Sequence, residues 1–192
     1  MEYMTKEDIS DIIVMHSNSY NCLSMLMNIC CQERRIEKVE DFAELLGENY
    51  STCDNLYNDR WLVRIAFTYA SLCKEKLMTT EELEILKNLP DKVKIYRGMT
   101  VEESTKEHQG VSWTLDKKVA EFFAYQYIRN PSTADKVIDK SEIIAVFWGR
   151  GEQEIIYMGT NEDGVDTDED DNLEAEEKWM NCRDDWEMGL LG

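Results

Sequence analysis

Two carboxylates stand close together in the stretch GRGEQEIIYM, which runs from Gly149 to Met158. Glu152 and Glu154 are two residues apart and directly precede an apolar run. In an extended strand, residues i and i+2 point to the same face, so we expect both acids to aim at one spot. Paired carboxylates can stabilise the positive charge that develops on a sugar when its glycosidic bond breaks, and one of them can act as a general base.

Two further groups of polar residues precede this pair along the chain. Arg97 follows Tyr96 in KVKIYRG, and Ser112 and Thr114 flank Trp113 in GVSWT. A guanidinium is a planar, permanently charged set of donors that suits phosphate. Each group alone also has a plain structural explanation: a surface cation, a turn followed by a helix N-cap, and the solvated face of a hairpin. Their chemistry becomes specific only in combination.

The residues around these groups indicate short strands. KVKIYRG alternates in character with a period of two and ends at Gly98, which predicts a strand, and GVSWT predicts a second short extended piece. The ranges 143–148 and 152–158 flank a Gly149-Arg150-Gly151 turn, which predicts a hairpin with the two acids at one end. The stretch LDKKVAEFFAYQYIRN returns to helical spacing.

Before these strands, residues 5–90 carry apolar residues at helical spacing. Thr5 followed by Asp8 predicts a helix start. Gly47 stands where a C′ glycine would end the helix in EKVEDFAELLG. The segment TTEELEILKNL stops at Pro90, because proline cannot continue a helix.

The length of 192 residues and the hydrophobic fraction of 43% predict one domain over 1–192 with an α+β fold. We expect N-terminal helices followed by a small, mainly antiparallel β core. Along the chain, residues 1–90 are expected to be helical and residues 91–158 to form the β-rich core. An acidic loop over 159–178 and a C-terminal helix over 179–192 are expected to follow.

The charge of the chain limits its partners. Its net charge is −19, from 21 basic and 40 acidic residues, which repels nucleic acid and anionic membranes. Acidic residues concentrate in 161–177, which we interpret as a solvated loop. The chain has no long apolar run and no secretory signal, so we expect a cytoplasmic protein without direct contacts to nucleic acid or membrane.

Six cysteines without a CxxC spacing predict reduced thiols rather than a disulfide framework. His16 and His108 are the two histidines of the chain, so the sequence predicts no metal site. We assign no role to His108.

Taken in order, Arg97, Ser112-x-Thr114 and Glu152-x-Glu154 resemble the mono-ADP-ribosyltransferase family of the Arg, Ser-x-Thr/Ser, Glu-x-Glu type. The sequence SWTLDKKVAEFFA is similar to that of small members from bacteriophages and bacteria. The resemblance implies two packed sheets around an NAD cleft. It also implies an NAD-dependent glycosyltransferase that places ADP-ribose on a cellular or host protein, acting as an effector in the (host) cytoplasm.

The resemblance further implies roles for the motif residues. Glu154 stabilises charge on the sugar and holds a ribose hydroxyl, while Glu152 orients or deprotonates the acceptor. Arg97 binds the phosphate, and Ser112 hydrogen-bonds Glu154. Glutamate at position 152 suggests an arginine as acceptor. The residues expected to bind or position NAD are Tyr96, Arg97, Gly98, Ser112, Trp113 and Thr114.

Two other functions remain open on the sequence. One is NAD hydrolysis, with water as the acceptor. The other is a non-catalytic acidic protein that occupies a basic, nucleic-acid-binding surface of a partner, which the charge of −19 favours.

Overall fold

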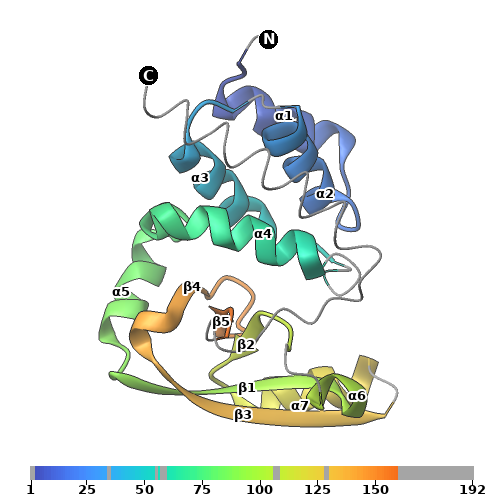
Figure 1. Cartoon of the computed structure of the whole chain (residues 1–192), viewed down its shortest axis with the longest axis vertical. Helices are drawn as coiled ribbons and strands as arrows, with labels where there is room; N and C mark the ends of the chain where they lie inside the picture. The colour runs from blue at the N-terminus through green and yellow to red at the C-terminus, as the bar shows by residue number, and fades with distance from the viewer. Residues whose placement is uncertain are drawn as a thin grey trace. The chain divides into compact units, whose positions relative to one another are not determined.

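The computed structural model describes residues 3–33, 36–54, 56, 60–105, 109–127 and 130–159. Within these residues the fold is α+β, as predicted, with helices in the N-terminal region and an antiparallel sheet after them (Figure 1). The acidic segment 161–177, the predicted C-terminal helix 179–192 and His108 lie outside the described residues. The described residues divide into two compact units, which we call the helical unit (residues up to 73) and the sheet unit (residues from 74 on).

The helical unit consists of short helices whose apolar faces pack on one another. Its described elements are α1 (Lys6–His16), α2 (Cys22–Met27), the π-helical turn η1 (Asn28–Gln32), α3 (Val39–Tyr50), α4 (Arg60–Ala70) and the start of the 3-10 segment η2 (Ser71–Lys76). The predicted helix start is confirmed, since Thr5 and Asp8 form a reciprocal capping box at α1.

Helix α3 shows how burial outweighs local preference. The prediction that Gly47 ends this helix is wrong, because α3 continues to Tyr50. Leu46 and Tyr50 are buried, and the Tyr50 ring meets that of Phe67 on α4 edge to face, with centroids 4.7 Å apart. Burying these side chains outweighs the roughly 1 kcal/mol that a glycine costs within a helix.

The sheet unit carries all the motif residues. Its described elements are α5 (Thr80–Asn88), β1 (Lys92–Thr100), α6 (Val101–Ser104), β2 (Ser112–Thr114), α7 (Lys117–Tyr127), β3 (Pro131–Asp139), η3 (Lys140–Glu142), β4 (Ile143–Phe147) and β5 (Glu154–Tyr157). The predicted change at Pro90 marks the end of α5, but α5 packs on β4 and belongs with the sheet. The predictions of β1, β2, α7 and the β4–β5 hairpin are confirmed, whereas β3 was not predicted.

Hydrogen bonds join the described strands into one antiparallel sheet in the order β3-β1-β2-β5-β4. β1 and β3 run side by side from Lys92 and Asp139 to Thr100 and Pro131 (Figure 1). β2 pairs with β5, and β5 with β4. The resemblance implies two packed sheets, whereas the described strands form one sheet. In it, the β3-β1 pair joins the β2-β5-β4 group at one described residue pair, Tyr96 with Thr114.

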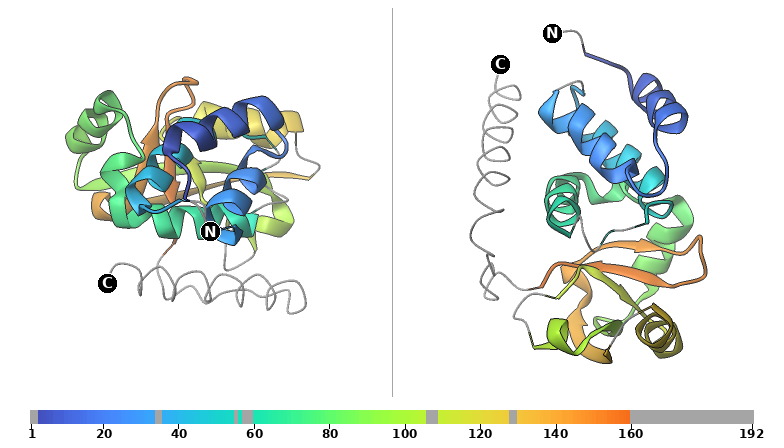
Figure 2. Two further views of the ribbon diagram at one scale, coloured as in Figure 1. Left: turned by 90° about the horizontal axis from the view of Figure 1, so that it is seen from above. Right: turned by 90° about the vertical axis from the view of Figure 1, so that its right-hand side faces the viewer.

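The β4–β5 hairpin has a longer loop than the predicted three-residue turn. The strands end at Phe147 and begin again at Glu154, so residues 148–153 form the connection (Figure 2). Gly151 and Gln153 both have positive φ, at 71° and 49°. The buried Glu82 on α5 accepts a hydrogen bond of 2.9 Å from the Trp148 amide, which fixes the start of the loop.

Helix α7 packs directly on the backbone of β1. Ala120 and Ala124 lie on its buried face, and a Cβ built on Gly98 would lie 2.2 Å from the Ala120 oxygen and 2.6 Å from the Ala124 nitrogen. Glycine at position 98 is therefore required for this close approach of helix and strand.

We predict that Gly98→Ala lowers the free energy of unfolding by about 1–3 kcal/mol or more, because backbone atoms on both sides must move apart. Urea denaturation of the full chain measures this. Gly149→Ala is the matched control, since a Cβ there meets nothing within 4 Å. Equal stability of the two variants would contradict the tight packing of α7 on β1.

Candidate functional site

Glu154 begins β5 next to the polar residues of β2. Thr114 pairs with Glu154, and Ser112 pairs with Ile156, so Ser112 and Glu154 are diagonal neighbours on one face of the ladder. The Ser112 hydroxyl donates a hydrogen bond to Oε1 of Glu154. Both side chains are partly exposed. The sheet therefore presents one carboxylate in a fixed position at a surface that a ligand can reach.

Glu152 is not positioned by the strand geometry that we expected. Its neighbour Gln153 has a φ of 49°, in the left-handed region, so residues 152–154 are not one extended segment. The expectation that Glu152 and Glu154 point to one spot because they are i and i+2 of a strand is therefore wrong. Glu152 lies on the 148–153 loop, where its Oε1 is 3.7 Å from Nε of Arg150.

Thr114 ties this loop to β2. Its Oγ1 donates to the Glu152 carbonyl at 2.6 Å and accepts from the Asp116 amide at 3.0 Å. Just beyond it, the Leu115 amide donates to the Gln153 carbonyl at 3.1 Å. Thr114 is 6% exposed, so its hydroxyl acts inside the protein. The position of Glu152 thus depends on hydrogen bonds from β2 to the loop backbone.

Arg97 reaches from β1 to β2 beyond the place where the two strands pair. Its Nη1 donates to the Ser112 carbonyl at 2.5 Å. Its Nε and Nη2 donate to Oε1 of Glu103 on α6, at 3.0 and 2.9 Å. The Arg97 side chain is 17% exposed. The guanidinium therefore bridges α6 and β2 where the described residues of β1 and β2 make no further pair.

These contacts link the three motifs. Glu103 holds Arg97, Arg97 holds the main chain of Ser112, and the Ser112 hydroxyl holds Glu154. Neighbours in a strand point to opposite faces, so Arg97 and Tyr96 leave β1 on opposite sides. The connection from Arg97 to Glu154 runs through the residue Ser112 rather than through direct contact between the two side chains.

Glu103 was not predicted from the sequence. A pattern that could have drawn attention to it is Thr100-x-x-Glu103, which resembles a capping box. Half of that motif forms, since the Thr100 hydroxyl accepts from the Glu103 amide at 2.8 Å. The Glu103 carboxylate instead turns to Arg97 and to the Gly110 amide.

The remaining predicted NAD-binding residues have packing contacts. Gly98 lies against α7. Trp113 is 3% exposed, its indole donates to the Gly110 carbonyl, and its ring meets that of Tyr157 edge to face. Tyr96 is partly exposed. It pairs with Thr114, which pairs with Glu154, so the three side chains lie on the same face of the sheet. Of the aromatic candidates on β1 and β2, Tyr96 is the one with accessible surface for a ligand.

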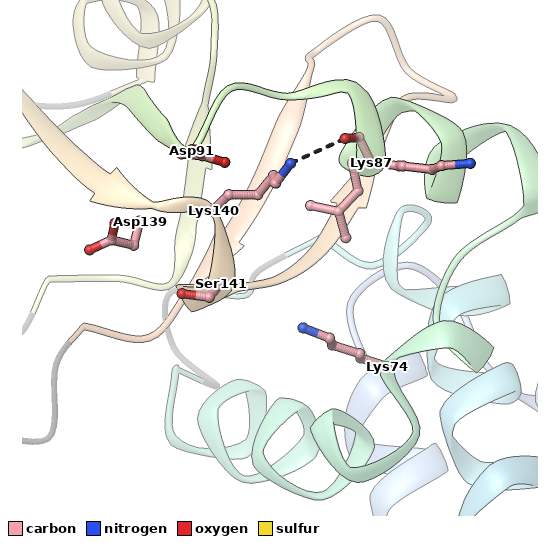
Figure 3. A pocket seen from close by; sticks show the side chains of 7 residues that line it. Lys74, Lys87, Asp91, Asp139, Lys140 and Ser141 are labelled. Carbon is pink, nitrogen blue, oxygen red and sulfur yellow. Dashed lines mark hydrogen bonds between the residues drawn. The ribbon is translucent and has the colours of Figure 1, made fainter.

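A pocket of about 460 Å³ lies at the opposite end of β1 (Figure 3). Its lining residues are Lys74, Leu86, Lys87, Asp91, Asp139, Lys140 and Ser141. The Lys140 ammonium donates to the carbonyls of Lys87 and Leu89, at 3.1 and 2.9 Å, and so caps the last turn of α5. Asp91 is six residues before Arg97, about 20 Å along an extended strand, so this pocket is separate from the motif residues.

Cysteines and acidic residues of the described ranges could in principle form a disulfide or a metal site. No disulfide joins the five cysteines of the described ranges, and Cys182 lies outside those ranges. Across the residues that the structure describes, no group of three His, Cys, Asp or Glu side chains could hold a metal ion. In the same residues, no helix has the length and apolar character needed to span a membrane.

Comparison with known proteins finds no matching family model, no matching curated protein and no matching solved structure.

We predict that Thr114→Val lowers the free energy of unfolding by about 1–2 kcal/mol, because the Glu152 carbonyl and the Asp116 amide lose their partner while the side-chain volume is kept. Chemical denaturation measures the loss. Thr133→Val on β3, where the side chain is exposed, is the control and should stay within about 0.5 kcal/mol of the wild type. A Thr114 variant as stable as this control would show that the loop is held by other contacts.

Proposed function

We propose that this chain is an NAD-dependent mono-ADP-ribosyltransferase that modifies a protein. The observation that carries the proposal is the hydrogen-bonded connection from Arg97 on β1 through Ser112 on β2 to Glu154 on β5. The strands of the three sequence motifs are neighbours in the sheet. The meeting of three motifs that are separated in the sequence supports a shared role.

The guanidinium of Arg97 fits a phosphate. A guanidinium has five N–H donors, and its bonds to Glu103 and Ser112 use three of them. The other two N–H donors would bind phosphate oxygens. Because Arg97 is mostly buried and already oriented, it would lose little freedom on binding an anion. In a chain of net charge −19, hydrogen bonds from this fixed guanidinium would help to hold the phosphates of a dinucleotide.

The carboxylate of Glu154 suits a sugar that becomes positively charged. NAD supplies an ADP-ribosyl group whose bond to nicotinamide breaks with the electron pair leaving on nicotinamide. Glu154 would place a negative charge beside that sugar, and Ser112 would fix the orientation of the carboxylate. A preorganised charge of this kind stabilises the transition state without having to move during the reaction.

Glu152 would serve the incoming acceptor. It lies on the 148–153 loop and its side chain is 30% exposed, so a protein target can approach it. It would accept the proton that the acceptor loses as its bond to the sugar forms. Because Thr114 holds the Glu152 backbone to β2, this second carboxylate is tied to the same strand that orients Glu154.

The charge of the chain favours a basic target surface. Forty acidic residues against 21 basic ones create a negative field that speeds encounter with a positively charged partner. The arginine acceptor that the Glu-x-Glu motif suggests agrees with such a surface. The negative charge thus supports a role in selecting the target in addition to the chemistry.

We predict that incubation with labelled NAD and a bacterial lysate labels a protein, and that Glu154→Gln lowers the labelling rate about a hundredfold or more, because the variant lacks the charge beside the sugar. Glu81→Gln, an exposed carboxylate of α5, is the control and should label like the wild type. Equal labelling by the Glu154 variant would remove Glu154 from the mechanism.

The same experiment separates the alternatives. Release of free ADP-ribose without a labelled protein would assign NAD hydrolysis. If the wild type neither labels protein nor consumes NAD, yet captures a nucleic-acid-binding protein in a salt-sensitive way, the chain is a non-catalytic acidic binder.

A further inference from the structure

Glu103 is a buried carboxylate that the three motifs do not explain. It is 8% exposed, and an ionised carboxylate at such a site is costly unless charges and donors compensate it. Its Oε1 accepts from Nε and Nη2 of Arg97 and from the Gly110 amide, at 3.0, 2.9 and 2.9 Å. One oxygen atom therefore organises both the guanidinium and the loop that leads into β2.

The backbone of Gly110 packs against the guanidinium of Arg97. A Cβ built on Gly110 would lie 2.1 Å from Nη2 of Arg97 and 2.5 Å from its Cζ. The loop can take this position because residue 110 has no side chain, and Glu103 holds its amide there. Arg97 is thus confined by Glu103 along one edge, by Gly110 at Nη2 and by the Ser112 carbonyl at Nη1.

We propose that Glu103 is the positioning residue that holds Arg97 in the orientation for binding the phosphates of NAD. Glu103 occupies the edge of the guanidinium formed by Nε and Nη2, and so directs the remaining donors of Nη1 and Nη2 away from α6. This inference rests on the proposed function, because it assigns Glu103 a role in the same site.

A purely structural brace is the competing explanation. In that case Glu103 would only stabilise the fold. Its loss would then lower the affinity for NAD no more than another substitution that destabilises the fold equally. The two explanations differ in the affinity for NAD of variants that remain folded. They also differ in whether Glu103→Gln, which keeps the acceptor oxygen but not the charge, recovers the affinity for NAD.

The test uses the full chain with three substitutions. Glu103→Ala removes the acceptor, and Glu103→Gln keeps an oxygen of the same reach. Glu102→Ala, an exposed neighbour on α6, is the matched control. Hydrogen exchange at the Gly110 amide and the NMR signal of the Arg97 Nε–H report the state of the contacts without NAD. Calorimetric titration with NAD then gives the dissociation constant.

We expect Glu103→Ala to accelerate exchange at the Gly110 amide, shift the Arg97 Nε–H signal and raise the dissociation constant for NAD about tenfold or more, a loss of about 1.4 kcal/mol. Glu103→Gln should restore the Gly110 protection and recover some of the affinity. Glu102→Ala should match the wild type in all three measurements.

Each outcome decides a separate point. If the wild type binds NAD and a folded Glu103→Ala variant binds it equally well, the inference is overturned and the proposed function stands. An unchanged Arg97 signal in Glu103→Ala overturns the inference whether or not NAD binds. If no variant and no wild-type protein binds NAD, the proposed function fails, and Glu103 is left as a structural brace.

Discussion

The arrangement of the sheet unit depends on one buried ion pair at the place where β1 and β2 separate. A guanidinium and a carboxylate with side-chain exposures of 17% and 9% are stable only if their charges and polar atoms find partners. Arg97 and Glu103 pair with one another, and the Ser112 carbonyl and the Gly110 amide add further hydrogen bonds. Through this pair, β1, α6 and the start of β2 are held in one geometry.

That geometry determines the position of Glu154, but not that of Glu152. Once Ser112 is held by Arg97, its hydroxyl fixes Glu154 on the next strand. Glu152 is controlled differently, through the backbone of its loop and the hydroxyl of Thr114. The two acids therefore have separate supports, which suits two different tasks: a fixed charge beside a sugar, and a more exposed group that meets an acceptor.

Much of the fold could be predicted from the sequence, because buried residues recur at regular spacing along helices and strands. The capping pair Thr5 and Asp8, the alternation in β1 and the hairpin of β4 and β5 all follow from neighbouring residues. The polar edge strand β3 was missed, since its stability comes from pairing with β1 along its length. The role of Glu103 could not be recognised because its partner Arg97 belongs to another element. The positive φ of Gln153 could not be predicted because it is a property of the folded loop.

A crystal structure with NAD bound tests the central claim most directly. We expect phosphate oxygens on Arg97 with the contact to Glu103 intact, and the nicotinamide-bearing ribose beside Glu154. NAD bound at the distant pocket lined by Lys140, or an Arg97 that remains out of reach of the phosphates, would contradict this claim.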